Sequence, residues 1–385
     1  MRGARNDAFF APARVERSVA ALLVGARQSG SLNLRGRGLA ELPAATWDIG
    51  SVPLPADSKW WETRETLEKL DASENALVEL PDAVAALPEL RELDLTRNRL
   101  HTLPAAACWS ALACLASVRL DFNELPSLPE GLGEAGAPPL VRLSVAHNCL
   151  TSLPVGALTK LQELDASHNR LQALPPGLGA LTQLRVLRLA TNRLTRLPPD
   201  FTGAPPPELS ELDVSENALD ELQLRGAAKL RVLRAAKNKL RVLRIDGCEA
   251  LCELVAAHNG LEQLPDGFES AAALATVDLS NNKIAALRPD LAASAALQRL
   301  DLSNNELRAL PPELGMAPSL THLLLQGNPL RTLPSHLLSG PTSKLLAYLA
   351  SRLPPQPAPP SAGAPPAGAR GIGSLAHSLT RSGTE

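Results

Sequence analysis

The stretch Val186–Leu194, VLRLATNRL, decides the fold of this chain. Leu187 and Leu189 are separated by one residue, which on a β-strand places both side chains on the inward face and Arg188 on the opposite face. Asn192 follows where the chain must bend. Its amide is expected to point inward and to bond with the backbone of neighbouring coils, because a buried amide without partners would cost about 1–3 kcal/mol.

The same phrase, L-x-L-x-x-N-x-L, recurs along most of the chain at intervals of 21 to 25 residues, and an earlier copy has Arg37 in the asparagine slot. This is the period of the leucine-rich repeat. Repeats of this length stack so that each contacts only its neighbours. We therefore expect an α/β repeat solenoid: a leucine-rich-repeat horseshoe with a parallel concave sheet, a loop or short-helix convex side and helical caps. A structural ladder is expected from Asn75, Asn98, Asn123, Asn148, Asn169, Asn192, Asn217, Asn238, Asn259, Asn282, Asn305 and Asn328.

Both ends of the repeat array are predicted to be capped. Residues 15–27, VERSVAALLVGAR, have the apolar spacing of a capping helix that follows a flexible segment 1–14. The solenoid is expected over 28–336 and a second capping helix over 337–353, with Leu345, Leu349 and Leu353 on one face. Residues 354–385, rich in Pro, Ala, Gly and Ser, are predicted to be disordered. An arginine-rich and acid-poor start leaves an organellar transit peptide as the alternative at the N-terminus.

An insert at about 44–62 lengthens the interval between the first two copies. It contains Trp47, Trp60 and Trp61, three of the 4 tryptophans. These side chains either fold back as a hydrophobic cover or offer an anchor to a partner. The cover is the preferred interpretation.

Composition limits the function classes and the compartment. A net charge of −2 gives no general attraction to nucleic acid, and no apolar run approaches the ~20 residues of a membrane span. The 5 cysteines are odd in number and form no flanking clusters, which favours an intracellular location, cytoplasmic with the nucleus as alternative. Cys248 stands in a leucine slot and is expected in the core. A metal or redox pair with Cys252 is the disfavoured alternative, since no further ligands have suitable spacing.

Motifs for chemistry are missing from the sequence. There is no phosphate-binding glycine loop, no dinucleotide fingerprint, no H-E-x-x-H and no paired C-x-x-C. His147 and His168 precede the asparagines of adjacent repeats and should be neighbours, with His258 in the same slot farther along, but a third metal ligand is lacking. We expect no enzymatic activity, no cofactor and no metal site.

Segments at both ends of the array carry a resemblance to a known family. Four features resemble the family of intracellular leucine-rich repeat-containing protein 40: ARQSGSLNLRGRGLAELP at 26–43, the Trp47 that follows it, WWE at 60–62 and LQGNPLRTLPSHLLSGPTSKLLAYLASRL at 325–353. The resemblance covers roughly residues 15–353. It implies an intracellular protein with the L-x-x-L-P repeats of Ras-pathway scaffold relatives, and it supplies no catalytic residue. Family members continue with further repeats where this chain has its proline-rich segment.

A protein partner on the concave face is the expected function, because a long sheet has little other use than contact. The chain is interpreted as a monomeric, non-catalytic scaffold or adaptor, in intracellular signalling by resemblance. The alternative is a fragment of a larger repeat protein, or of a repeat-containing signalling enzyme whose catalytic domain is missing. An ordinary solvated sheet face would show the same mixed charges. The expected contact residues are Glu92, Asp94, Arg119, Arg142, Glu163, Asp165, Arg188, Glu211, Asp213, Arg234, Asp278 and Asp301.

Overall fold

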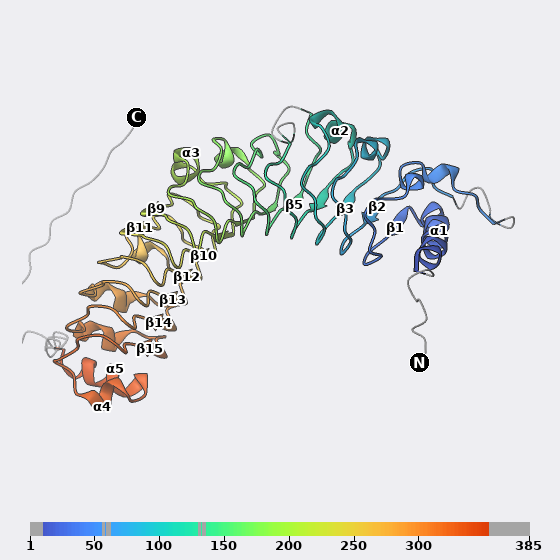
Figure 1. Ribbon diagram of the computed structural model, residues 1–385. Coiled ribbons are helices and arrows are strands. Elements are labelled where there is room, and N and C mark those ends of the chain that lie inside the picture. Colours follow the sequence, from blue (N-terminus) through green and yellow to red (C-terminus); the bar gives the residue numbers. More distant parts are fainter. Residues whose placement is uncertain (1–10, 56–57, 59–62, 130–131, 133–135, 354–385) are drawn as a thin grey trace, which may run out of the picture. The chain divides into compact units, whose positions relative to one another are not determined.

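The computed structural model describes residues 11–55, 58, 63–129, 132 and 136–353, and only the backbone at 11–18 and 335. It confirms the leucine-rich-repeat solenoid. A 13-stranded sheet takes one strand from each coil, and every pair of neighbouring strands is parallel and in register (Figure 1). Its strands are β1 Ser31–Asn33, β2 Lys69–Asp71, β3 Glu92–Asp94, β4 Ser117–Arg119, β5 Arg142–Ser144, β6 Glu163–Asp165, β7 Val186–Arg188, β8 Glu211–Asp213, β10 Val232–Arg234, β12 Glu253–Val255, β13 Thr276–Asp278, β14 Arg299–Asp301 and β15 His322–Leu324.

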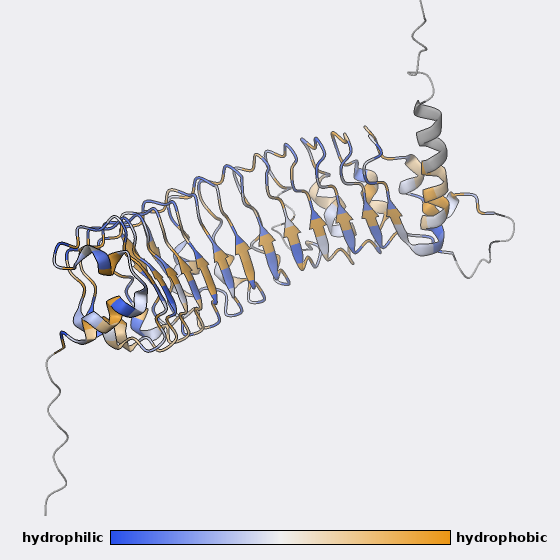
Figure 2. Cartoon of the chain, turned by 90° about the horizontal axis from the view of Figure 1, so that it is seen from below, coloured by the Kyte–Doolittle hydropathy of each residue, from blue (hydrophilic) through white to orange (hydrophobic). Residues whose placement is uncertain are grey.

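The core is a column of leucines between the sheet and the outer arcs. Leu187, Leu189 and Leu194 are each 0% exposed, whereas Arg188 between the strand leucines is partly exposed. The alternation of apolar and polar residues is visible along the strands in Figure 2. Leucine, and in some coils valine or alanine, stands at these equivalent positions, and these side chains join into one continuous cluster. The inward and outward assignment of the repeat is therefore confirmed.

The asparagine ladder is present. In Asn192, Nδ2 donates to the carbonyls of Leu189 at 3.0 Å and of Ala166 in the preceding coil at 2.9 Å, and Oδ1 accepts from the Leu171 N–H at 3.1 Å. The following coil bonds differently from our expectation: its Asn217 reaches back to Leu189 at 2.9 Å. Each asparagine thus joins its own coil to the preceding one, not to both neighbours, and Asn192 is only half-buried.

A left-handed residue makes the bend before each asparagine. In every coil but the last, φ of this residue lies between 54° and 58°, a conformation that costs most side chains energy and that Asn and Gly adopt readily. The last coil has Gly327 in this slot, with φ 78°. The other residues are Glu74, Arg97, Phe122, His147, His168, Thr191, Glu216, Lys237, His258, Asn281 and Asn304.

The convex side consists mainly of single turns, as predicted. Proline ends pairing after the asparagine and starts most of these turns. Short α-helices and 3-10 turns on this side are η5 Asp82–Ala86, α2 Ala106–Ala111, η7 Leu178–Ala180, α3 Pro199–Gly203, η8 Phe268–Ser270, η9 Pro289–Ala293 and η10 Pro312–Met316. Two consecutive arcs differ and form a second, 2-stranded parallel sheet from β9 Glu221–Gln223 and β11 Val242–Arg244.

The N-terminal cap is longer than the predicted helix 15–27. Helix α1 spans Ala11–Ser29, so residues 11–14 belong to the cap and not to a separate flexible segment. Val19 and Leu23 of α1 are buried against the first coil. Residues 1–10 lie outside the described part of the chain.

The C-terminal cap consists of two helices, so the prediction of one helix over 337–353 is wrong. They are α4 Ser335–Leu338 and α5 Thr342–Ala350, separated at Gly340–Pro341, where proline disfavours helix at the residue before it. Leu345 and Leu349 of α5 are buried, as predicted, but Leu353 lies beyond the helix. The expected disordered segment 354–385 lies outside the described residues.

The insert packs against the N-terminal cap. It contains η2 Ala44–Thr46 and η3 Ile49–Ser51, and its Ile49 is 0% exposed. Trp47 packs against the core, as the cover interpretation requires for this residue. The Arg27 guanidinium of α1 donates to the Val52 carbonyl. Trp60 and Trp61 lie outside the described residues.

All five cysteines are free thiols. Cys248 is 0% exposed in the core, as predicted, and burial raises its pKa to about 11. None of the helices in the described ranges is long and apolar enough for a membrane span.

Candidate protein-binding face

The residues predicted to contact a partner all lie on the solvent side of the large sheet, at the first or third position of a strand. The first positions form one row across the strands and the third positions a second row, because the sheet is in register. The first row contains Glu92, Arg142, Glu163 and Glu211. The third-position row contains Asp94, Arg119, Asp165, Arg188, Asp213, Arg234, Asp278 and Asp301.

Several of these charges neutralise one another across β7 to β12. Arg188 binds Glu211 through two contacts, Nε–Oε1 at 3.0 Å and Nη2–Oε2 at 3.3 Å. Arg234 lies between two acids, 3.5 Å from Glu211 and 3.1 Å from Glu253. The hydrogen bonds to Glu211 raise the pKa of Arg188 above its ordinary value. This chain of four charges is already paired, so a partner would have to displace internal contacts to use it.

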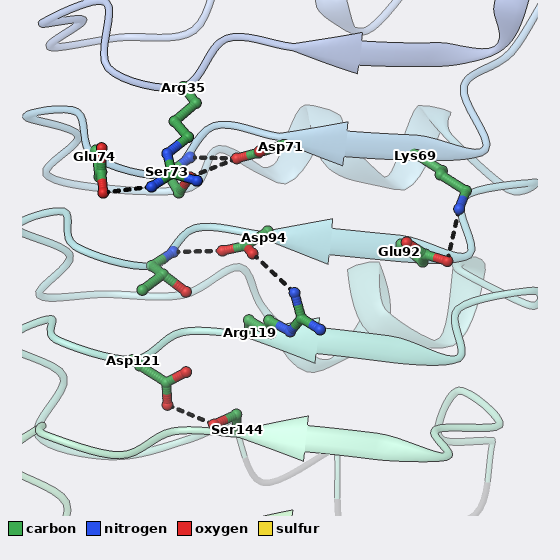
Figure 3. A network of polar contacts seen from close by, with 11 residues as sticks. Arg35, Lys69, Asp71, Ser73, Glu74, Glu92, Asp94, Arg119, Asp121 and Ser144 are labelled. Carbon is green, nitrogen blue, oxygen red and sulfur yellow. Dashed lines mark hydrogen bonds and ion pairs between the residues drawn. The ribbon is translucent and has the colours of Figure 1, made fainter.

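Two further pairs lie at the N-terminal end of the face. Lys69 Nζ is 2.9 Å from Glu92 Oε1, and Arg119 Nη1 is 3.4 Å from Asp94 Oδ2 (Figure 3). All four side chains are solvent-accessible, so each pair stabilises the fold by at most about 1 kcal/mol. Their geometry nevertheless orients Glu92, Asp94 and Arg119 toward neighbours within the sheet.

The aspartates of the third-position row also have a structural role that sequence reasoning missed. In Asp165, Oδ1 accepts a hydrogen bond from the Ser167 N–H at 3.0 Å and thereby holds the turn after the strand. One oxygen of each such carboxylate is occupied in this way. The same bond to the residue two positions on is formed by Asp71, Asp94, Asp213, Asp278 and Asp301.

Asp121 supplies this bond where the neighbouring repeat lacks an aspartate. The third position of β5 is Ser144, and Asp121 of the preceding coil accepts from the Ala146 N–H at 2.7 Å and from Ser144 Oγ at 2.6 Å (Figure 3). Burial raises the pKa of Asp121, against the opposing effect of these hydrogen bonds. A carboxylate of the preceding coil thus replaces the aspartate that would otherwise hold the turn after β5.

Arg142 and Glu163 differ from the paired charges. Both are exposed, they are direct neighbours in register, and within the described residues neither forms an ion pair. They border a groove of about 160 Å³ over β4 to β7, which Ser144, Asp165 and Arg188 also line. The centre of the concave face therefore carries two charged side chains, Arg142 and Glu163, that line a groove and form no ion pair with any described residue.

A column of rings occupies the left-handed slot that follows β4, β5 and β6. Phe122 and His147 stack with ring centroids 4.1 Å apart, and His147 and His168 with centroids 3.9 Å apart. The Arg97 guanidinium carbon lies 4.7 Å from the Phe122 centroid. The prediction that the two histidines are neighbours is confirmed. Burial and the nearby His168 lower the pKa of His147.

Phe122 is the contact candidate that sequence reasoning missed. It remains 42% exposed although it is large and apolar. Its signal in the sequence was an aromatic residue directly before an asparagine, followed by histidine at the same slot in the next two repeats. No group of three His, Cys, Asp or Glu side chains suited to a metal was found in the described part of the chain.

Comparison with known proteins agrees with this repeat architecture. The family model "Leucine rich repeat" matches residues 272–330, and "Leucine Rich repeats (2 copies)" matches residues 159–203. Among curated proteins, mouse Tsukushi is 28% identical over 61% of this chain and 60% of its own length. Mouse leucine-rich repeat serine/threonine-protein kinase 1 is 31% identical over 46% of this chain but only 8% of its own length.

Among solved structures, a leucine-rich-repeat protein of Leptospira interrogans has a TM-score of 0.58 and 27% identity. The match covers 81% of this chain and 87% of that one. The chain spans less than two thirds of the length of the two curated relatives named here. These likenesses support a leucine-rich-repeat protein and single out no one subfamily. The chain is a leucine-rich-repeat solenoid, a fold that typically serves as a protein-binding scaffold.

Proposed function

We propose that this chain is a non-catalytic adaptor that binds a protein partner on the concave face, centred on β4 to β6. The proposal is carried by Arg142 and Glu163, which form no ion pair with any described residue, together with the exposed Phe122 in the bend after β4. Aromatic residues, phenylalanine among them, and arginine are enriched at protein–protein interfaces relative to the rest of the surface. Elsewhere on the face the charges are largely satisfied within the sheet, so they have less to gain from a partner.

Charge order on this strip favours selective recognition. A partner must bring an acidic group to Arg142 and a basic group to Glu163 in the adjacent strand. Complementarity of this kind sets specificity and association rate more than affinity. Five free thiols and the resemblance to an intracellular leucine-rich-repeat family support an intracellular adaptor, in the cytoplasm.

The test exchanges these two charges. Affinity capture from cell lysate followed by mass spectrometry would compare the wild type with the double variant Arg142→Glu, Glu163→Arg. The swap retains net charge and alters neither the inward leucines nor the ladder, so the fold should persist while partners of the wild type are lost. We avoid Arg188 and Arg234 because their reversal would gather four acids with Glu211 and Glu253 and endanger the fold.

A matched control lies off the sheet. Glu306 and Arg308 are exposed, follow the ladder asparagine of their coil and form no ion pair among the described residues. The swap Glu306→Arg, Arg308→Glu should therefore retain the partners. Loss of partners in this control and their retention in the sheet variant would place the binding surface elsewhere.

The match to a repeat-containing kinase motivates a second candidate, a piece of a larger signalling enzyme. That match covers 8% of the kinase and 46% of this chain. Sequencing of the full-length transcript distinguishes the two, because a catalytic domain in the same reading frame would replace the adaptor proposal.

A further inference from the structure

The second, smaller sheet lies on the convex side of the solenoid, next to α3 (Figure 1). In most repeats the convex arc after the ladder asparagine forms a single turn. The arcs after Asn217 and Asn238 lack the usual proline and are extended. Strands β9 and β11 pair in parallel, with Leu222 opposite Leu243. An open sheet of two strands must leave its outer backbone groups unpaired unless something covers them.

One edge of this sheet is covered. On the outer side of β11, the Ile245 N–H donates to the Asp266 carbonyl at 2.9 Å, and the Asp266 N–H donates to the Leu243 carbonyl at 3.0 Å. The next coil thus continues the sheet for a short distance. This edge has no row of free backbone groups at its centre.

The edge of β9 is open. Leu224 and Gly226 direct their N–H groups toward β11, to Arg244 and Asp246. Because successive residues of a strand point to opposite sides, Glu221 and Gln223 direct their backbone groups away from β11. On that side the Arg225 N–H donates to the Thr202 carbonyl at 3.3 Å. Within the described residues the backbone N–H groups of Glu221 and Gln223 form no hydrogen bond there.

A notch lies beside this edge. Helix α3 ends at Gly203 in the preceding arc, and the change from helix to strand between two coils leaves a cavity of about 410 Å³. Leu197 and Thr202 line it from the side of α3 and Gln223 from β9. An extended segment placed there could therefore reach the free groups of Gln223.

The notch also carries unpaired positive charge. Arg196 and Arg225 both line it, both are exposed, and neither forms an ion pair with any described residue. The opposing acid is Glu221, which accepts a hydrogen bond from Gln223 Nε2 at 3.0 Å. The notch is thus lined by two guanidinium groups and one carboxylate, and this excess of positive charge favours an acidic occupant.

We propose that the edge of β9 binds an extended acidic segment of a partner protein by strand addition. Main-chain hydrogen bonds to Gln223 supply the pairing, and Arg196 and Arg225 bind carboxylates of the segment. This surface lies on the convex side next to α3, away from the concave face proposed above as the adaptor site.

The probe for the test is a fluorescein-labelled peptide of alternating valine and glutamate. Its fluorescence anisotropy should show saturable binding to the full chain, weakened at least tenfold by Arg196→Glu with Arg225→Glu. The control Arg170→Glu with Arg308→Glu removes two exposed arginines elsewhere and should bind like the wild type. Circular dichroism establishes that all variants are folded. Lack of saturable binding, or equal loss in the control, overturns the proposal.

Two readouts report the pairing itself. Hydrogen exchange of the Gln223 amide should slow when the peptide binds, and a peptide N-methylated on alternate residues should not bind. Equal binding of the N-methylated peptide, or an unchanged Gln223 exchange rate, would show simple charge attraction. A dimer in light scattering that excludes the peptide would instead assign the edge to a second copy of this chain.

Discussion

Polar side chains at fixed points of each repeat hold the backbone where no regular pairing can do so. Asn148 is buried and bonds the carbonyls of Leu120 at 2.9 Å and Val145 at 3.1 Å, and it accepts from Leu125 N–H at 3.1 Å. These groups belong to bends, where neither helix nor sheet can satisfy them. The ladder therefore replaces secondary structure at the bend.

Replacing Asn148 with leucine should lower the free energy of unfolding by about 1–3 kcal/mol, because buried carbonyl and N–H groups lose their partner. Urea denaturation followed by circular dichroism measures the effect. The same change at Asn192, which is half-buried, should cost less because water can reach the freed groups. An unaltered midpoint for Asn148→Leu would contradict the role assigned to the ladder.

At the scale of single residues, the sequence predicted the asparagine ladder. It did not predict which charged side chains of the sheet form bonds within the protein. The spacing of leucine and asparagine determines which side chains point inward, and that follows from strand and bend geometry alone. An aspartate at position 165 is compatible with two roles, contact with a partner and support of its own turn, and the sequence does not distinguish them. The pairing of Arg188 with Glu211 also depends on side-chain conformation across strands, which a repeat period does not specify.

The capping helix α5 shows how tightly one element can depend on a neighbour's glycine. Helix α5 packs against η10, and a Cβ built on Gly315 would lie 2.3 Å from the Ala350 nitrogen and 2.6 Å from the Leu346 carbonyl oxygen. Backbone atoms cannot yield as a flexible side chain can. Glycine at 315 is thus required by this close approach.

Gly315→Ala should destabilise the C-terminal end by about 1–3 kcal/mol, as expected for overpacking. Hydrogen exchange over 342–350 should become faster as α5 is displaced. Gly203→Ala is the control, because a Cβ there meets nothing within 4 Å. If α5 exchanged equally in both variants, the close packing of α5 on η10 would be disproved.

Some elements could be predicted and others could not. The caps were expected from apolar spacing, yet Gly340–Pro341 divides the second one, a break that proline indicates directly. The strands β9 and β11 were not expected. Their arcs look like the other arcs except that they lack proline, and whether such an arc pairs depends on its neighbour also being extended.

At the scale of the whole solenoid, each internal coil is covered on both sides by its neighbouring coils, and the first and last coils need a cap. Helix α5 covers the C-terminal coil with Leu345 and Leu349, which are 3% and 2% exposed. It also protects the edge of the sheet, since Thr342 Oγ1 accepts a hydrogen bond from the Leu323 N–H of β15 at 3.1 Å. An uncovered edge strand beside exposed leucine favours association.

Two truncations separate the cap from the segment that follows it. Deletion of 354–385 should leave the unfolding midpoint unchanged, whereas deletion of 342–385 should destabilise the last coils, because each of two buried leucines contributes about 1.5–3 kcal/mol. Urea denaturation, light scattering and hydrogen exchange over β14 and β15 compare the two truncated proteins. Because both lack 354–385, any difference between them is due to residues 342–353. Equal midpoints and equal scattering would mean that the last coil needs no cover. If the shorter deletion were as damaging as the longer one, residues 354–385 would themselves stabilise the solenoid.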